Sequence, residues 1–319
     1  MICIPITARS PEDTVSEMIS ASKHADIVEL RIDYIPELQN AEACIEESLK
    51  RKTKPVIITN RPEREGGKFN GSEQDRLRLL QKAIDLGADY VDVEYDSIKQ
   101  ITRRNSSKII ISHHNFKETP HNLSKIYDDI CQQKPDIVKI VTYANDIIDN
   151  IRIFELLKSA QIPTISFCMG ESGYISRILT KKFGGFLTFA SLEKGKESAP
   201  GQLTVDELSK IYHFKEINEE TKLYGIIGNP VSHSMSPAIH NAAFIEKGLN
   251  NVYVPLKIAN IDAFMRECRK IDFQGFSVTI PHKESILPFL DDLDHTARKI
   301  GAINTIVNLN GKLTGYNTD

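Results

Sequence analysis

The residue best suited to covalent chemistry is Lys139, which lies in the apolar segment 136–143. A lysine buried among apolar neighbours loses the hydration that stabilises its ammonium form, so burial favours the neutral amine. A neutral amine is a nucleophile that can form a Schiff base with a carbonyl substrate. A lysine at a strand edge that reaches water is the alternative, and position alone favours neither interpretation.

Two adjacent histidines, His113 and His114, end the strand-like segment that precedes the lysine. A histidine beside a Schiff base could move protons to and from the substrate. Because side chains alternate along a strand, only one of the two can point to the same side as Lys139, and the alternation does not say which. Glu94, at the end of another predicted strand, could orient that histidine or balance its charge.

Further charged and polar residues follow the other strand-like segments of the first 212 residues. Arginine forks bind carboxylates, so arginines near a lysine indicate an anionic substrate, although some of them would pair with nearby glutamates. The candidates at this rim are Glu29, Arg31, Arg61, Arg177, Ser198 and Gln202.

The elements that must position these residues alternate between strand and helix periodicity. Leu77, Leu80 and Ile84 recur at helical spacing, and Thr204 with Glu207 forms a capping box at the start of another helix. Continuous apolar runs fit strands that are buried on both faces of a parallel sheet. Eight such units in about 210 residues predict a (β/α)8 barrel, with a doubly wound sheet as the alternative. The predicted strands are 2–7, 26–33, 55–61, 90–95, 108–114, 136–143, 163–169 and 186–192.

A charged segment, 215–222, is predicted to be a linker to a second α/β region. Asn310-Gly311 in that region is the preferred two-residue turn of a β-hairpin. The expected strands are 223–228, 251–256, 275–280, 303–308 and 312–316, with helices at 237–246, at 261–271 and up to 290. Ser234 and Ser236 lie between the first strand and the first helix, where they could cap the helix or bind a carboxylate.

The overall composition is that of a globular protein, and it excludes several classes. The chain has 319 residues, 40 of them Lys or Arg and 43 Asp or Glu, and this net charge of −3 gives no electrostatic reason to bind nucleic acid or an anionic membrane. No apolar run reaches the ~18 residues of a membrane helix. The five cysteines are scattered without Cys-x-x-Cys spacing, so no disulfide framework or metal site is expected. The first residues carry no targeting pattern, so a cytoplasmic location is expected.

Seven motifs of the first region, taken in order, resemble those of type I 3-dehydroquinate dehydratases. The resemblance implies a TIM barrel over residues 1–214 that dehydrates 3-dehydroquinate to 3-dehydroshikimate without a metal or redox cofactor. The motifs are Val28-Glu-Leu-Arg-Ile-Asp33, Thr59-Asn-Arg61 with Glu65-Gly-Gly67, Asp92-Val-Glu94, Ser112-His-His-Asn-Phe116 with Thr119-Pro120, Ile137-Val-Lys-Ile140, Ser176-Arg177 and Ser198-Ala-Pro-Gly-Gln202.

The same resemblance implies a role for each candidate residue. Lys139 would form an imine with the ring ketone, and His114 would remove the neighbouring proton and then protonate the departing hydroxyl. Glu94 would hold His114, and Arg177 would bind the substrate carboxylate. The residues that would hold the hydroxyls or shape the segment after the eighth strand are Glu29, Arg31, Arg61, Ser198 and Gln202.

The second region is similar to the substrate-binding domain of shikimate dehydrogenases over residues 223–319. The matching motifs are Gly228-Asn-Pro230, His233-Ser-Met-Ser-Pro237, Ser277-Val-Thr-Ile-Pro-His-Lys283, Gly301-Ala-Ile-Asn-Thr305 and Asn317-Thr-Asp319. The resemblance implies that Ser234 and Ser236 bind the shikimate carboxylate. It implies that Thr279, Asn304 and Asp319 bind ring hydroxyls, and that Lys283 and Asp319 form the catalytic pair. Many members carry Asn at the position of Ser277, so no ligand role is assigned to Ser277.

Hydride transfer needs a dinucleotide site, usually a glycine-rich turn between a strand and a helix. Residues 1–319 contain no such motif, so we expect the NADP-binding domain to lie beyond Asp319 and this chain alone to lack dehydrogenase activity. The leading hypothesis is a fused dehydratase and shikimate dehydrogenase that acts on small molecules in the shikimate pathway of aromatic amino acid biosynthesis. A Schiff-base barrel of the aldolase type and a non-enzymatic protein that keeps the pockets are the alternatives.

Overall fold

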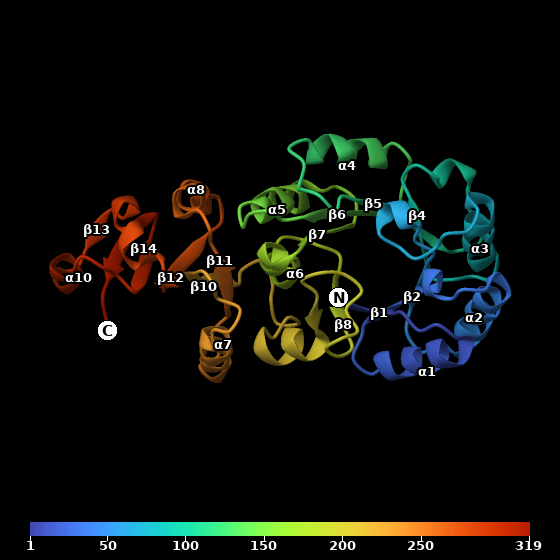
Figure 1. Ribbon diagram of the computed structural model, residues 1–319, viewed down its shortest axis with the longest axis horizontal. Helices are drawn as coiled ribbons and strands as arrows, with labels where there is room; N and C mark the ends of the chain where they lie inside the picture. The colour runs from blue at the N-terminus through green and yellow to red at the C-terminus, as the bar shows by residue number, and fades with distance from the viewer.

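The computed structural model describes all of residues 1–319 as an elongated molecule with a barrel at one end and a smaller α/β unit at the other (Figure 1). All eight strands predicted for the first region are present, and each begins and ends within two residues of its predicted bounds. The strands are β1 (Ile2–Ile6), β2 (Ile27–Arg31), β3 (Val56–Thr59), β4 (Tyr90–Glu94), β5 (Lys108–His114), β6 (Ile137–Tyr143), β7 (Thr164–Met169), β8 (Thr188–Ser191) and the short β9 (Leu203–Thr204).

The strand order identifies the first sheet as a barrel. Its parallel strands run β7-β6-β5-β4-β3-β2-β1-β8-β9, so β8 returns to pair with β1. A doubly wound sheet would instead reverse its order at a switch point, and that alternative is wrong. Two hydrogen bonds join the segments next to β7 and β8. The N–H of Phe186, two residues before β8, donates to the Thr164 carbonyl of β7 (2.8 Å), and the N–H of Gly170, just after β7, donates to the carbonyl of Pro200, which lies between β8 and β9 (3.2 Å).

Apolar periodicity explains how the helices pack around this barrel. The three leucine and isoleucine positions predicted at helical spacing, Leu77, Leu80 and Ile84, are buried on α3. The predicted capping box forms, since the Glu207 N–H donates to Thr204 Oγ1 (3.1 Å) and the Thr204 N–H to Glu207 Oε2 (2.8 Å). The helices are α1 (Pro11–Ala21), α2 (Leu38–Arg51), α3 (Glu73–Asp85), α4 (Leu123–Cys131), α5 (Asp149–Ser159) and α6 (Tyr174–Leu179).

The second unit is a six-stranded sheet of order β11-β10-β12-β14-β15-β13. The predicted hairpin turn is present, and Asn310 and Gly311 both have positive φ, as the two-residue turn requires. The pair β13 and α10 was not predicted. The strands are β10 (Lys222–Gly228), β11 (Asn251–Lys257), β12 (Phe273–Val278), β13 (Asp292–Leu293), β14 (Thr305–Leu309) and β15 (Lys312–Tyr316), and the helices are α7 (Ser236–Glu246), α8 (Ile261–Glu267), α9 (His282–Ser285) and α10 (His295–Ile300).

The charged segment 215–222 packs against both units. Ile217 is buried in the apolar core that continues from the barrel into the second unit. Lys182 Nζ donates to the Glu219 carbonyl (2.8 Å), and Thr221 Oγ1 donates to Asn250 Oδ1 (2.7 Å). Lys222 is already the first residue of β10.

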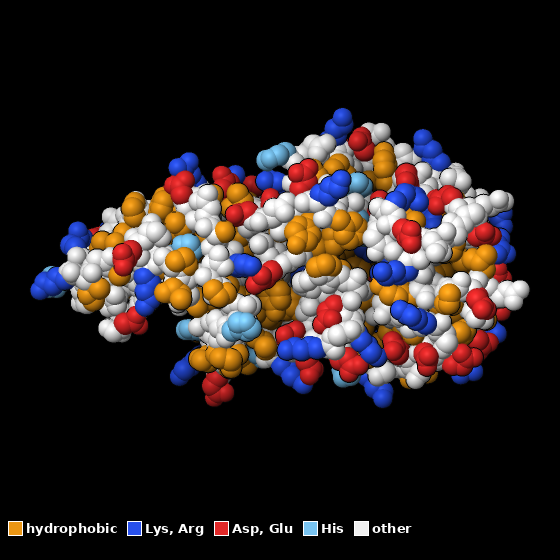
Figure 2. All heavy atoms as spheres, in the orientation of Figure 1, with side chains coloured by type: hydrophobic (Ala, Val, Ile, Leu, Met, Phe, Trp, Pro, Cys, Tyr) orange, Lys and Arg blue, Asp and Glu red, His pale blue; other side chains and the backbone are white.

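Two features describe the surface and the helices. On the face shown in Figure 2, basic and acidic side chains are interspersed over both units. No helix combines the length and the apolar character that crossing a membrane requires.

Candidate active site

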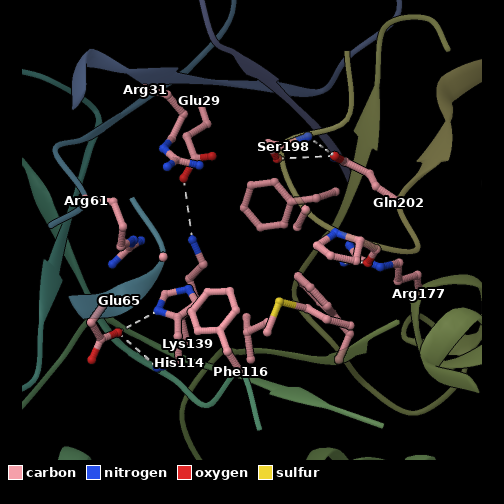
Figure 3. A pocket seen from close by; sticks show the side chains of 17 residues that line it. Glu29, Arg31, Arg61, Glu65, His114, Phe116, Lys139, Arg177, Ser198 and Gln202 are labelled. Atoms are coloured by element: carbon pink, nitrogen blue, oxygen red, sulfur yellow. Dashed lines mark hydrogen bonds and ion pairs between the residues drawn. The ribbon is translucent and has the colours of Figure 1, made fainter. Parts of the chain in front are cut away.

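A cavity of about 280 Å³ opens near the carboxyl ends of the barrel strands (Figure 3). Lys139 lies between two groups of side chains, with Arg61 and Glu65 on one side and Arg177 and Gln202 on the other. Parallel strands bring their carboxyl ends together, which is why residues far apart in the sequence meet here. The predicted barrel residues that line the cavity are Glu29, Arg31, Arg61, His114, Lys139, Arg177, Ser198 and Gln202.

Lys139 is 4% exposed, and its side chain lies against two carboxylates. Its Nζ atom is 2.7 Å from Asp92 Oδ2 and 3.4 Å from Glu29 Oε1. The sequence alone did not reveal either carboxylate as a partner of the lysine. Burial alone would raise the pKa of the Asp92 carboxyl. The positive charges of Arg61 and Lys139 outweigh this effect and hold that pKa far below its usual range.

His114, at the end of β5, is the histidine whose ring lines the cavity. Its Nδ1 atom is 2.8 Å from Glu65 Oε2, and its backbone N–H donates to the same oxygen at 3.0 Å. Two contacts to one carboxylate oxygen fix both the strand end and the ring. When Glu65 is ionised, it accepts the Nδ1 proton and leaves Nε2 free to act as a base.

The prediction that Glu94 holds His114 is therefore wrong. The Glu94 Oε1 atom accepts from Arg61 Nη1 (2.6 Å), and its Oε2 atom accepts from Arg76 Nη1. Glu94 is fully buried and does not line the cavity. Two arginines outcompete a histidine for this carboxylate because they carry a permanent charge and can each donate several hydrogen bonds.

Glu65 reaches the histidine through a tight turn that its two following glycines allow. Gly66 has a φ of 74°, and a Cβ atom there would lie 2.1 Å from the Phe116 ring. A Cβ atom on Gly67 would lie 1.9 Å from the Arg61 carbonyl oxygen. The Glu-Gly-Gly sequence was visible as a motif, but only these contacts give its glutamate a role.

Burial disfavours charge on both members of the Glu65–His114 pair. Desolvation raises the pKa of the Glu65 carboxyl to about 7. Desolvation, reinforced by the positive charges of Arg61 and Lys139, lowers the pKa of His114 well below its usual value. Near neutral pH the imidazole is neutral, the form that a general base needs.

Arg177 on α6 is the cavity arginine without an anionic partner. Arg31 pairs with Asp33 (2.8 Å), and Arg61 pairs with Asp92 and Glu94. The Arg177 guanidinium lies 4.3 Å from the centroid of the Phe167 ring, and its buried Nε has no hydrogen-bond partner. Burial lowers the pKa of Arg177 to about 10. A buried cation with unused donors is suited to bind an anionic ligand.

Ser198 and Gln202 belong to the segment between β8 and β9 and are bonded to each other. The Ser198 N–H and Oγ donate to Gln202 Oε1 at 2.7 Å and 3.2 Å. The Gln202 Nε2 donor is buried without a partner, so it can bind a ligand oxygen.

The predicted residues of the second unit make the following contacts. Lys283 Nζ lies 2.5 Å from Asp319 Oδ2, and Asn304 Oδ1 accepts from the Thr318 N–H at 3.2 Å. Ser234 Oγ accepts from the Ser236 N–H at 3.2 Å and lines a different cavity at the junction with the barrel. Thr279 packs against Gly228. A Cβ atom added to Gly228 would lie 2.4 Å from the Cγ2 atom of Thr279.

The residues of the second unit do not fit the phosphates of a dinucleotide. No two of the 17 glycines stand two positions apart, so no Gly-x-Gly turn lets the backbone approach a pyrophosphate. The Lys283–Asp319 pair is exposed, with 34% and 65% of the two side chains accessible. No hydride-transfer step follows from residues 1–319.

Comparison with known proteins matches each half of the chain to a family. Residues 2–219 match the model of the type I 3-dehydroquinases. The chain belongs to this family. Residues 226–306 match the substrate-binding domain of shikimate dehydrogenases, so both resemblances drawn from the sequence are confirmed.

Relatives of this type I 3-dehydroquinase carry both activities in one polypeptide. The chain is 44% identical over its whole length to the bifunctional 3-dehydroquinate dehydratase/shikimate dehydrogenase, chloroplastic, of Arabidopsis thaliana, and spans 55% of that relative. A structure of the dehydroquinate dehydratase and shikimate dehydrogenase of S. pombe AroM covers 99% of this chain at 29% identity, with a TM-score of 0.57, and 64% of that structure is matched.

The barrel alone also has a solved relative. The 3-dehydroquinate dehydratase of Aquifex aeolicus covers 66% of this chain at 30% identity with a TM-score of 0.56, and 97% of that enzyme is matched. The two family matches and the two sheets of the structure confirm the predicted barrel followed by a second α/β unit.

Proposed function

We propose that this chain dehydrates 3-dehydroquinate to 3-dehydroshikimate through a Schiff base on Lys139. The observation that carries the proposal is one cavity that holds a buried lysine, a neutral histidine and the unpaired cation Arg177. These three groups supply a nucleophile, a base and a carboxylate receptor. Residues 1–214 would form this dehydratase unit.

The reaction follows from the positions of these groups. The Lys139 amine attacks the ring ketone as its free base, and the carbinolamine takes up one proton from solvent and loses water to form a protonated imine. That proton returns to solvent when the imine is hydrolysed. The imine withdraws electrons, so His114 Nε2 can remove a proton from the adjacent carbon. The electron pair then forms a carbon–carbon double bond as the hydroxyl group leaves, and His114 returns the proton to it as water. Hydrolysis of the imine releases the enone and regenerates the amine.

The remaining cavity residues would bind the substrate. Arg177 would hold the carboxylate, and the Gln202 amide and Ser198 hydroxyl would contact ring hydroxyls. The same binding role is proposed for Glu29, Arg31 and Arg61, which line the cavity beside Lys139.

For the second unit, 223–319, we propose shikimate binding as part of an NADP-dependent shikimate dehydrogenase, with 215–222 joining it to the barrel. Ser234 and Ser236 would bind the carboxylate, and Lys283 with Asp319 would exchange the proton. Thr279 and Asn304 would bind ring hydroxyls. NADP would supply or accept the hydride. The cytoplasmic location stays a prediction, since the Arabidopsis relative is described as chloroplastic.

The decisive experiment mixes the full chain with 3-dehydroquinate and follows the absorbance of the conjugated enone. Sodium borohydride added during turnover should reduce the imine and leave a stable adduct, which peptide mass spectrometry should place on Lys139. Products of carbon–carbon cleavage would indicate an aldolase instead. Binding of substrate without either enone or adduct would indicate a non-enzymatic protein.

The Glu65–His114 pair predicts how the rate depends on pH. We expect kcat to fall as the pH drops through about 7, because the buried Glu65 carboxyl, whose pKa is about 7, then becomes protonated. A protonated Glu65 no longer accepts the Nδ1 proton, so the tautomer with a free Nε2 is lost. Glu65→Gln keeps an acceptor that does not titrate, so the acid limb should vanish while kcat stays within about tenfold.

The control for this profile is Glu63→Gln, which alters an exposed glutamate of the same turn. It should keep the acid limb of the unmodified chain. An unchanged limb in Glu65→Gln would show that another group controls the pH dependence.

Arg177 predicts a selective loss of substrate affinity. Arg177→Met should raise KM by about 10- to 100-fold, because a charge-assisted hydrogen bond contributes roughly 1.5–3 kcal/mol. The methyl ester of the substrate separates this effect from general damage. The unmodified chain should prefer the acid to the ester, and Arg177→Met should treat both alike. A variant that still prefers the acid would place the carboxylate elsewhere.

A further inference from the structure

Arg76 on α3 is a fully buried arginine whose guanidinium is saturated with acceptors. Its Nε and Nη2 atoms donate to the two Glu73 oxygens at 2.9 Å and 2.6 Å, and Nη2 also donates to Ser97 Oγ at 3.0 Å. Its Nη1 atom donates to the Asn60 carbonyl at 3.1 Å and to Glu94 Oε2. All five N–H groups are used, so the side chain is fixed in one orientation.

A continuous chain of buried ion pairs joins Arg76 to the lysine of the cavity. Glu94 is shared between Arg76 and Arg61, whose Nη1 atom lies 2.6 Å from Glu94 Oε1. Asp92 is shared between Arg61 and Lys139, each with a nitrogen 2.7 Å from Asp92 Oδ2. Each carboxylate therefore lies between two cations.

The geometry of this chain makes the Lys139 position depend on Arg76. Glu94 and Asp92 stand two residues apart on β4, so both side chains project from the same face of the strand. Without Arg76, the buried Glu94 would keep Arg61 as its single cation. Arg61 would then shift toward Glu94 and away from Asp92, and the Asp92–Lys139 contact would move with it. Removal of one partner from a buried ion pair has large effects because the remaining charge is uncompensated.

We propose that Arg76 is a positioning residue for the Schiff-base lysine, although it lies outside the cavity and touches no substrate. It acts through Glu94, Arg61 and Asp92 to hold the Lys139 amine in line with the substrate carbonyl. The proposal rests on the proposed dehydratase function and gives Glu94 a role that its missing contact with His114 left open.

The experiment compares Arg76→Met and Arg76→Lys in the full chain. Arg76→Met should lower kcat by about 30- to 100-fold with KM within about twofold, because a misplacement of about 1 Å at the reacting atom costs about 10²-fold. The rate of borohydride trapping at Lys139 should fall in parallel. Arg76→Lys keeps the charge but cannot donate to all five acceptors. Its kcat should therefore be about three- to tenfold below that of the unmodified chain.

Controls separate positioning from a general loss of structure. Arg78→Met replaces an exposed arginine of the same helix and should leave kcat unchanged. In a Glu94→Gln background, Arg76→Met should lower kcat by less than about threefold, because the route through Glu94 is already broken.

A variant of either kind that loses thermal stability but keeps the unmodified kcat and trapping rate would show that Arg76 is merely structural. If Arg76→Met does not fold, Arg76→Lys decides by the same criterion. An unmodified chain that neither turns over 3-dehydroquinate nor forms the adduct would instead contradict the proposed function.

Discussion

Replacement of Lys139 with methionine should abolish dehydration and borohydride labelling together. The imine is the electron sink of the reaction, so we expect kcat to fall by at least about 10⁴-fold, as when a covalent route is removed entirely. Methionine fills the buried volume but leaves Asp92 and Glu29 without the ammonium that lies 2.7 Å and 3.4 Å from them. The free energy of unfolding should therefore also decrease, by about 3 kcal/mol.

Enone absorbance, adduct mass and thermal unfolding measure these effects in one preparation. Lys108→Met is the control, because Lys108 is an exposed lysine at the other end of the adjacent strand β5. It should keep both activity and labelling. Full dehydration by a folded Lys139→Met chain would exclude the Schiff-base mechanism.

Replacement of His114 with alanine should separate the two halves of the reaction. Without the base, kcat should fall by about 10³- to 10⁴-fold, the upper part of the range for general acid–base catalysis. Attack by Lys139 on the ketone does not need a proton to leave the adjacent carbon. The imine should therefore accumulate, and borohydride should still label Lys139 to nearly full occupancy.

His113→Ala is the matched control, since His113 is the preceding residue of the same strand and does not line the cavity. Its kcat should stay within about threefold of the unmodified value, as for a residue outside the reacting geometry. If His113→Ala lost most of its activity and His114→Ala stayed active, the base would be His113 and not His114.

The sequence predicted the framework of the site because local patterns encode it. Continuous apolar runs specify strands buried on both faces, and parallel strands in sequential order close into a barrel. Polar residues within or just after such strands gather at one end of the barrel, and Lys139, His114 and Arg177 do line one cavity there, although Glu94 at the end of β4 does not. The Asn310-Gly311 turn was predictable for the same reason, since its geometry depends on two residues alone.

The choice of partners within the site emerged from the folded structure. Glu65 rather than Glu94 binds His114, and Arg61 is engaged by two carboxylates while Arg177 has none. Each outcome depends on distances of about 3 Å between segments that are remote in the sequence, where a small displacement exchanges one ion pair for another. A pattern of residue types specifies which strand a charge lies on. The packing of neighbouring helices and turns, such as α3 with Arg76, determines which opposite charge it meets.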